Sequence, residues 1–518
     1  MKISDLPLPA DIIEYYARAE AGITELYPPQ AEAVEKGLLD NNILAAIPTA
    51  SGKTLLSELA MLSAIRSGGK ALYIVPLRAL ASEKYDQFSK FREIGVKVGI
   101  SSGDFDSRDE YLGDNDIIVA TSEKADSLLR NETHWIHDLT TLVVDEIHLL
   151  DSPDRGPTLE VTIAKLRRII PRLHIIALSA TVGNANEIAD WLDAECVRSE
   201  WRPVDLREGV LLGETIHFLG RKEADLPVGR AGPVIALVND TLHDGGQCLI
   251  FDSSRRNAVS TALSVSKALR PPNNPNDSDP TDLIDLADTV RESETDAAQK
   301  LADCIEHGVA FHHAGLISEH RKIVEDGFRS NRIKVIACTP TLAFGLNLPA
   351  RRVIIKSYHR YDPNYGMQPI PILEYKQMAG RAGRPHLDPS GECVLIAKKY
   401  SEMEWLRENY IESDPEPIHS KLGTESALRS HILSAITGMF ATTQQELMDF
   451  LELTFFAAQQ ETETSYLRDI VENVLDFLSE NEMITAAGES LDPTPLGRLV
   501  SRLYLDPRGA SIIIYGLR

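Results

Sequence analysis

The feature that most constrains this chain is an apolar run that passes through a Ser-Gly-Lys-Thr loop into a long helical pattern. Residues 41–47 (NNILAAI) form a short apolar run after turn residues, and KTLLSELAMLSAIRS has helical spacing that stops at Gly68-Gly69. In a strand–loop–helix unit of this kind, backbone N–H groups and the helix N-terminus face an anion. The stretch predicts a strand, a phosphate-binding loop and a helix.

The loop supplies the side chains that nucleotide phosphates require. It contains Ile47, Pro48, Thr49, Ala50, Ser51, Gly52, Lys53 and Thr54. Gly52 allows close backbone approach, Lys53 reaches the β- and γ-phosphates, and the Thr54 hydroxyl binds Mg²⁺. Because Ile47 stands where the usual pattern has its first glycine, the loop alone leaves a chance turn open as the alternative.

A second acidic motif indicates an ATPase. The apolar segment 140–150 (TTLVVDEIHLL) places Asp145 and Glu146 at a strand end. In such enzymes the aspartate holds the Mg²⁺ shell and the glutamate polarises the attacking water. Since phosphoryl transfer depends on positioning, we expect this pair and the phosphate loop at the carboxyl ends of neighbouring parallel strands.

Length and charge limit the classes of protein. A chain of 518 residues exceeds one ordinary core and predicts three or four domains. There is no apolar run near the length of a membrane span and no signal-peptide layout, so we expect a cytoplasmic protein. A net charge of −24 means that a nucleic-acid site must be locally basic or use backbone donors, and adaptation for solubility is the other reading. The five scattered cysteines fit reduced, packed thiols.

The tetrapeptide Asp145-Glu146-Ile147-His148 resembles the DExH box of superfamily 2 helicases, and the resemblance covers essentially the whole chain. The motifs that follow the family's order are LYPPQ (26–30), VPLRALASEKY (75–85), ATSEKADSLLR (120–130), SAT (179–181), LIFDSSRR (249–256), VAFHHAGL (309–316), ACTPTLAFGLNLPA (337–350) and QMAGRAGRP (377–385). Segments 145–160 and 420–434 resemble the Ski-like branch, and within it the Hjm-like archaeal DNA repair helicases, which are relatives of the polymerase theta helicase.

The resemblance implies an α/β fold of two RecA-like lobes, each a doubly wound parallel sheet, followed by a winged helix. We expect motor lobe one at 1–200, motor lobe two at 201–400, the winged helix at 401–495 and the start of a truncated helical ratchet domain at 496–518. The apolar runs that predict strands are 71–75, 116–120, 142–145 and 174–179 in lobe one, and 248–252, 334–338, 353–356 and 393–397 in lobe two.

Family motifs also imply roles for individual residues. Arg384 is the predicted arginine finger that reaches ATP from the second lobe, with Arg381 beside it and Gln377 near the γ-phosphate or its water. Gln30 would read adenine and Gly345 would contribute to the ATP site. His148, Ser179 and Thr181 would couple nucleotide state to strand binding, and a packed core histidine is the alternative for His148.

Strand binding would use backbone N–H groups and short side chains that contact phosphates without reading sequence. The candidates are Pro76, Arg78, Thr121, Ser122, Ser253, Ser254, His312, His313 and Thr339. Residues 354–375 read as a duplex-splitting β-hairpin with Tyr361, Tyr365 and Met367 as wedge residues, or as a purely structural hairpin. In the winged helix, Lys421, Arg429 and His431 are candidates to face DNA, although a hinge role is favoured.

Together these motifs imply an ATP- and Mg²⁺-dependent DNA helicase that moves 3′ to 5′ on single-stranded and forked DNA in replication-fork repair. We expect a monomer with no membrane contact, and replication or recombination proteins among its partners. An RNA helicase of the same branch and a non-unwinding, ATP-gated nucleic-acid clamp are the alternatives. Backbone contacts barely distinguish the two sugars, whereas intact Lys53, Glu146 and Arg384 oppose a clamp.

Overall fold

The computed structural model describes residues 1–18, 22–101, 109–131, 133–269, 280–340, 348–362, 366–460 and 464–517. The chain folds into two compact units. The first unit comprises Met1–Ile47, Gly52–Glu200 and Pro417–Arg518, and the second comprises Pro48–Ser51 and Trp201–Glu416. Within the described residues, no helix combines the length and the apolar character needed to cross a membrane.

A seven-stranded, wholly parallel sheet forms the centre of the first unit, in the order β3-β4-β2-β5-β6-β1-β7. Its strands are β1 (Ile43–Ala46), β2 (Lys70–Val75), β3 (Val98–Ser101), β4 (Ile117–Thr121), β5 (Leu139–Val144), β6 (His174–Ser179) and β7 (Glu195–Arg198). All four strands predicted for lobe one are confirmed within a few residues. Strands such as β1 and β4 are continuous buried runs because helices cover both faces of the sheet, whereas the edge strand β7 is only partly buried.

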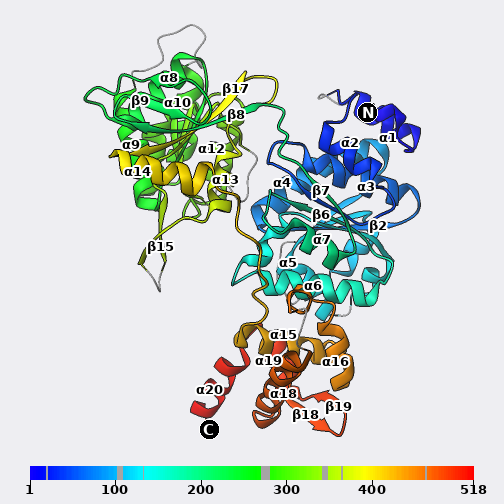
Figure 1. Cartoon of the computed structure of the whole chain (residues 1–518). Coiled ribbons are helices and arrows are strands. Elements are labelled where there is room, and N and C mark those ends of the chain that lie inside the picture. The colour runs from blue at the N-terminus through cyan, green and yellow to red at the C-terminus, as the bar shows by residue number, and fades with distance from the viewer. Residues whose placement is uncertain are drawn as a thin grey trace. The chain divides into compact units, whose positions relative to one another are not determined.

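Helices enclose this sheet on two sides (Figure 1). They are α1 (Ala10–Arg18), α2 (Pro28–Glu35), α3 (Lys53–Arg66), α4 (Arg78–Phe88), α5 (Ser122–Arg130), α6 (Gly156–Ile169) and α7 (Ala185–Leu192), with short 3₁₀ turns at Ile3–Asp5, Ser89–Ile94, Glu110–Asp114, His134–Asp138 and Ile147–Asp151. Alternate strand residues such as Ile43 and Ala45 share a core with α1, α2, α3 and α4. This period of two is what a sheet buried on both faces requires.

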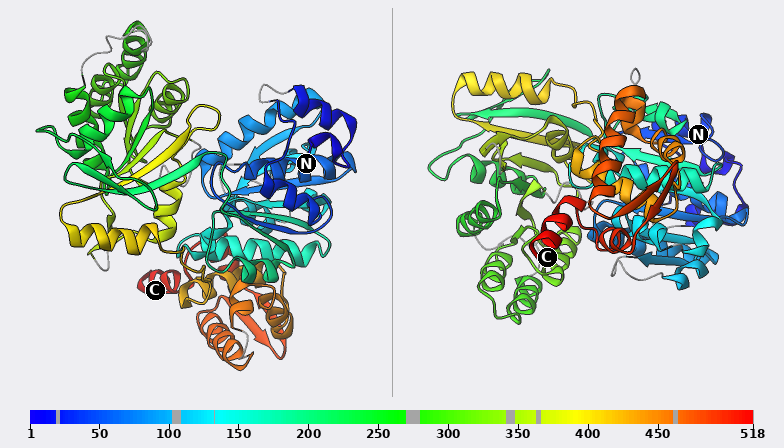
Figure 2. Two further views of the ribbon diagram at one scale, coloured as in Figure 1. Left: turned by 45° about the horizontal axis from the view of Figure 1, so that its top comes forward. Right: turned by 90° about the horizontal axis from the view of Figure 1, so that it is seen from below.

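The C-terminal part of the first unit is a set of helices followed by a small hairpin. It contains α15 (Glu425–Thr437), α16 (Gln444–Leu451), α17 (Phe455–Gln459), α18 (Thr464–Glu480), β18 (Ile484–Ala487), β19 (Ser490–Pro493), α19 (Pro495–Arg502) and α20 (Pro507–Leu517). Gly488 turns the hairpin at φ +65°. Val161 and Ala164 of α6 lie in the core of these helices, which pack against the cyan helices in Figure 2.

A buried polar cluster joins α15 to α5 and α6. Lys165 Nζ donates to Asp126 Oδ1 at 2.7 Å and to Ser434 Oγ at 2.8 Å. Burial lowers the pKa of His431, which lies beside this cluster, to about 3. Arg429 is also buried. The less favoured alternative, in which Arg429 and His431 face DNA, is therefore not supported, because α15 turns both side chains into the interior.

An eight-stranded sheet forms the centre of the second unit, in the order β10-β9-β8-β17-β14-β11-β13-β12. Its strands are β8 (Asp205–Leu212), β9 (Thr215–Phe218), β10 (Ala224–Asp225), β11 (Cys248–Phe251), β12 (Val309–His312), β13 (Val335–Cys338), β14 (Arg352–Ile355) and β17 (Ser390–Ala397). The four predicted strands are confirmed. The sequence did not reveal β8, whose first half is polar, or the antiparallel strands β9 and β10 beside it.

The helices of the second unit are α8 (Pro233–His243), α9 (Arg255–Ala268), α10 (Pro280–Arg291), α11 (Asp296–Ile305), α12 (Ser318–Arg329), α13 (Ile372–Ala379) and α14 (Tyr400–Leu406), which continues as a π-helical turn at Arg407–Ile411. A separate hairpin, β15 (His359–Asp362) and β16 (Gly366–Pro369), projects from this unit (Figure 1).

Candidate functional site

The phosphate loop connects β1 to α3 and adopts a conformation that requires glycine. Ala50 and Gly52 have φ of 72° and 76°, in the left-handed region. A Cβ added to Gly52 would lie 2.3 Å from Gln30 Nε2. The Gln30 amide donates to the Gly52 carbonyl at 3.0 Å, so the predicted adenine contact lies against the loop. The left-handed conformation therefore favours glycine at position 52, and a larger residue there would displace the Gln30 amide.

Ile47 continues the core of the sheet rather than the loop. Its side chain is completely buried, and its N–H donates to the Ser179 carbonyl at 3.3 Å, just beyond β1 and β6. This position accounts for an isoleucine where a glycine is usual, because the chain leaves the sheet only after it. Pro48, Thr49 and Ala50 are half-buried, and Ser51 is buried.

Lys53 and Glu146 face each other at the end of this sheet. Lys53 Nζ lies 3.7 Å from Glu146 Oε2. The ammonium is buried and, within the described ranges, makes no hydrogen bond. A buried cation with unused donors can bind a phosphate. Glu146 itself has a φ of 54°, and such backbone strain in a residue other than glycine concentrates at functional sites.

The order of the strands corrects one prediction. β6 lies between β1 and β5, so the phosphate loop and the acidic pair do not end neighbouring strands. The prediction was wrong because strand spacing along the chain carries no information about the order of strands in the sheet. Ser179, a predicted coupling residue, ends β6 and is completely buried between them, and Thr181 follows it half-buried.

Lys84 joins the two residues predicted to bind Mg²⁺, and the sequence analysis did not identify it. Lys84 Nζ donates to Thr54 Oγ1 at 2.8 Å and lies 3.9 Å from Asp145 Oδ2. The Tyr73 hydroxyl donates to the same Asp145 oxygen at 2.8 Å. Burial raises the pKa of Asp145, and the Lys84 ammonium opposes that rise. The available signal was a lysine on the apolar stripe of α4 formed by Leu80, Ala81 and Phe88.

The oxygen donors of this site fit a magnesium ion. A hydroxyl and a carboxylate are ligand types that Mg²⁺ prefers, and it commonly bridges protein carboxylates to substrate phosphates. Thr54 and Asp145 supply these two groups, and Lys84 brings both to one point. The residues present are therefore suited to the metal.

His148 and Arg155 extend the acidic motif. His148 Nδ1 lies 3.5 Å from Glu146 Oε2. Burial lowers the pKa of His148, which favours the neutral imidazole. Arg155 Nη1 donates to the Pro76 carbonyl at 2.7 Å, so the segment after the acidic motif contacts the predicted strand-binding segment. The sequence analysis missed this arginine.

The arginine motif of the second unit is held by contacts within that unit. Arg384 donates to both oxygens of Asp388, at 2.8 and 2.7 Å, and to Gln247 Oε1 at 2.8 Å. Its guanidinium is therefore used inside its own unit. Gln377 and Arg381 are buried beside it, and Arg202 Nη2 donates to the carbonyls that flank Arg381.

The predicted strand contacts divide into exposed and buried groups. Arg78 and Ser254 are exposed and Ser253 is half-buried, whereas the buried set comprises Pro76, Thr121, Ser122, His312, His313 and Thr339. The Thr121 hydroxyl caps α5 by accepting from Lys124 N, at 3.3 Å. His312 Nε2 lies 2.9 Å from Glu325 Oε1. The His312 ring is therefore buried and directed into its own unit.

The hairpin carries two of the predicted wedge residues. Tyr361 and Met367 are directly opposite each other in the β15–β16 register, and they are 69% and 56% exposed. The hairpin strands are shorter than 354–375, because the flanking residues belong to β14 and α13. Tyr365 and Gly345 lie outside the described residues.

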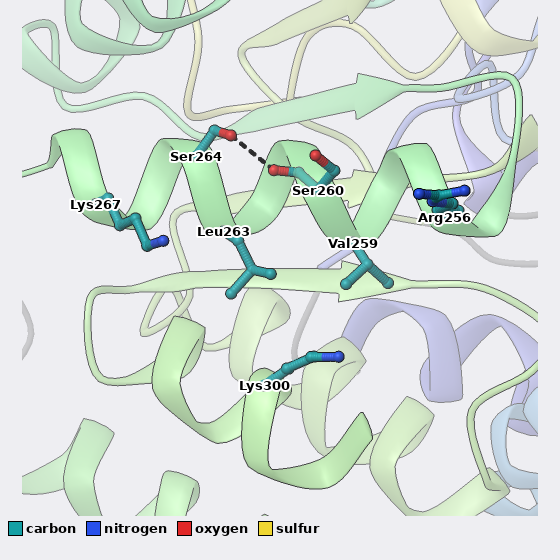
Figure 3. A pocket seen from close by; sticks show the side chains of 7 residues that line it. All are labelled: Arg256, Val259, Ser260, Leu263, Ser264, Lys267 and Lys300. Carbon is teal, nitrogen blue, oxygen red and sulfur yellow. Dashed lines mark hydrogen bonds between the residues drawn. The ribbon is translucent and has the colours of Figure 1, made fainter. Parts of the chain in front are cut away.

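A shallow groove on α9 and α11 is lined by cations. Figure 3 shows Arg256 and Lys267 on α9 and Lys300 on α11, with Val259 and Leu263 pointing into the same space. Ser260 and Ser264 complete its lining, which contains no carboxylate among the residues described. In a chain with a net charge of −24, this is a local attraction for an anion.

Three family models match the chain in order. The model described as DEAD/DEAH box helicase matches residues 27–188, the helicase conserved C-terminal domain matches residues 276–386, and a helix-turn-helix domain matches residues 391–485. The first match covers the phosphate loop and the acidic motif, and the second ends just after the arginine motif.

Similar proteins match the chain along its whole length. The ATP-dependent DNA helicase Hel308 of Methanocella arvoryzae is 58% identical over 100% of this chain and 70% of its own length. The proteins of that name from Pyrobaculum calidifontis and Pyrococcus horikoshii are 46% and 43% identical, each over 99% of this chain and over 72% and 70% of their own lengths. The chain therefore belongs to the Hel308 family of ATP-dependent DNA helicases.

Proposed function

We propose that this chain uses ATP to translocate 3′ to 5′ along single-stranded DNA and to open forked DNA during replication-fork repair. The observation that carries the proposal is the pair formed by Lys53 Nζ and Glu146 Oε2, 3.7 Å apart at the end of a parallel sheet. Polarity and the role at forks follow from the family resemblance. We expect a monomer that works with replication or recombination proteins.

For ATP hydrolysis, we assign Lys53 to the phosphates and Glu146 to the attacking water. Mg²⁺, when bound, neutralises charge on the phosphate oxygens, and Thr54 and Asp145 are the residues that would hold it. The His148 imidazole, 3.5 Å from Glu146, orients that carboxylate. Arg381 supplies the positive charge that the transferred phosphoryl group requires.

For strand binding, we assign the exposed residues Arg78 and Ser254, together with backbone N–H groups of the same motifs. Such contacts bind phosphates and read no sequence. The cationic groove begins two residues after Ser254 and continues along α9. Arg256 and Lys267 are eleven positions apart on the helix, which corresponds to about 16 Å at the helical rise. We infer that the groove contacts the DNA backbone beyond the motif.

For strand separation, we assign the hairpin. A base-pair step costs about 1.4 kcal/mol on average to open. Stacking of a base on an aromatic side chain contributes about 1–3 kcal/mol, so Tyr361 with Met367 beside it can offset much of one step. The exposed, opposed positions of these side chains support this assignment.

The test is steady-state ATPase activity without nucleic acid, with single-stranded DNA and with matched single-stranded RNA. We expect strong stimulation by DNA, and a loss of about 10²–10⁴-fold in the Glu146→Gln variant. Equal or greater stimulation by RNA would replace the DNA assignment by RNA remodelling. No stimulation by either would contradict a strand-coupled motor. Partial duplexes with a 3′ or a 5′ tail test the polarity, since only the 3′ tail should support unwinding.

A further inference from the structure

Helix α4 connects the nucleotide site to the predicted strand contacts. It begins at Arg78, one of the exposed strand candidates, and carries Lys84 less than two turns further along. Lys84 is buried, whereas Arg78 is exposed. A single helix therefore presents one end to the strand-binding surface and its middle to the residues around the phosphate loop.

The Lys84 ammonium contacts the two oxygen groups, Thr54 Oγ1 and Asp145 Oδ2, that we assign to Mg²⁺. Its ammonium lies 2.8 Å from Thr54 Oγ1 and 3.9 Å from Asp145 Oδ2, with the Tyr73 ring centroid 5.9 Å away. A buried ammonium is costly unless polar groups satisfy it. A divalent cation at Thr54 and Asp145 needs the same oxygens and is repelled by the ammonium. Lys84 and the metal therefore compete.

We propose that Lys84 is an exchangeable internal cation of the ATP site. It holds Thr54 and Asp145 together, gives up these oxygens when Mg²⁺ and nucleotide bind, and so transmits nucleotide binding along α4 to the strand contact at Arg78. The inference rests on the Mg²⁺ site of the proposed function and adds to it a residue that sets metal affinity and couples it to DNA.

A second polar contact of α4, which is independent of the two Mg²⁺ oxygens, lies near its C-terminal end. Near the C-terminal end, Gln87 Nε2 donates to Glu58 Oε1 at 2.7 Å, and Glu58 in turn accepts from the Tyr16 hydroxyl at 2.9 Å. This anchor involves neither Thr54 nor Asp145 and stays in place. Loss of the Lys84 contact removes a polar link between α4 and the nucleotide site, while Leu80 and Ala81 keep the helix packed on the core. Coupling of this kind is reciprocal, so DNA must change metal-dependent nucleotide binding as well.

The experiment is a Mg²⁺ titration of the full chain with a fluorescent ADP analogue at a fixed, saturating concentration, for wild type, Lys84→Met and Lys90→Met. Lys90 is exposed shortly after α4 and is the matched control for loss of one positive charge. We expect the half-saturating Mg²⁺ concentration to fall about 5-fold or more in Lys84→Met, which is the lower end of typical coupling between sites, and to stay unchanged in Lys90→Met. The effect of Mg²⁺ and ADP on single-stranded DNA affinity should shrink in Lys84→Met only.

The outcomes separate this inference from the proposed function. An unchanged or increased half-saturating Mg²⁺ concentration in Lys84→Met, with wild type still Mg²⁺-dependent, overturns the exchange and leaves the metal site intact. Nucleotide binding that ignores Mg²⁺ in wild type overturns the metal site and the exchange together. Circular dichroism checks folding, and Lys84→Gln, which is neutral but can still donate to Thr54, must shift in the same direction as Lys84→Met.

Discussion

The nucleotide site of the first unit and the hairpin of the second unit meet their ligands in opposite ways. At the nucleotide site the charged groups are buried and held by partners, as Lys84 holds Thr54 and Tyr73 holds Asp145. On the hairpin, Tyr361 and Met367 are exposed and rely on each other across two short strands. The charges of a phosphate group have the same arrangement in every nucleotide, so rigidly held side chains can match them. Base pairs differ in sequence, so an apolar side chain that stacks on any base is better suited to them.

The largest loss of activity should come from the arginine motif, whose side chains are largely buried and held by partners like those of the nucleotide site. We expect Arg381→Ala to lower DNA-stimulated ATPase turnover by about 10³-fold, the lower range for an arginine that stabilises phosphoryl transfer. Arg384→Ala should lower turnover less and should mainly destabilise the second unit, because Arg384 is bound to Asp388 and Gln247. The checks are turnover and the urea midpoint of unfolding. A greater loss of turnover in Arg384→Ala would restore Arg384 as the finger.

The buried polar cluster of Lys165, Asp126 and His431 has charged groups that are held by partners, as at the nucleotide site, but these groups stabilise the fold. The pKa of His431 is about 3 in the folded chain and about 6.5 in an unfolded one, so the unfolded state binds more protons between these values. Stability from neutral His431 is present above pH 6.5 and is lost as pH falls toward 3, by about 3 kcal/mol at pH 4.

The measurement is the free energy of unfolding in urea from pH 8 to pH 4, for wild type and His431→Gln. The variant should lose less stability on acidification. The carboxylates that do not interact with His431 are common to both proteins and cancel in the difference, including Glu160, whose pKa burial raises to about 7. Asp126 interacts with His431 directly, so its contribution is part of the measured difference. Parallel pH profiles would contradict the assignment.

The hairpin should show the smaller and more selective effect of an exposed site. We expect the Tyr361→Ala, Met367→Ala double variant to lower unwinding of a forked duplex about tenfold, the equivalent of one base-pair step, and to leave DNA-stimulated ATPase within about twofold. Tyr400→Ala removes an exposed aromatic ring elsewhere in the second unit and is the control. Normal unwinding by the double variant would make the hairpin purely structural.

The smallest effect should come from the groove on α9, where the cations are exposed and screened by salt. We expect the Arg256→Glu, Lys267→Glu double variant to weaken single-stranded DNA binding by roughly tenfold at low salt and less at high salt, with a shallower salt dependence. Ser260→Ala, in the same groove, should bind normally. If fluorescence anisotropy gives the same single-stranded DNA affinity for the charge-reversed variant and wild type, the groove does not contact DNA.

The sequence by itself determined the local units of this protein. Apolar runs located nine of the strands in the two large sheets. The motifs Asp145-Glu146 after one of them and Gly52-Lys53-Thr54 after another indicated the chemistry. These features are encoded within a few adjacent residues, because strand burial, turn conformation and helix start are decided by neighbouring side chains.

Only the tertiary structure decided which units meet. It placed β6 between β1 and β5, brought Lys84 to Thr54 across 30 positions, bound Arg384 to Asp388 and turned His431 into the interior. The physical reason is that such contacts depend on the order of strands and on the rotation of each helix about its axis. Both depend on how whole helices and sheets pack against one another. The spacing of apolar residues along the chain specifies which face of an element is apolar, but not which other element that face will contact.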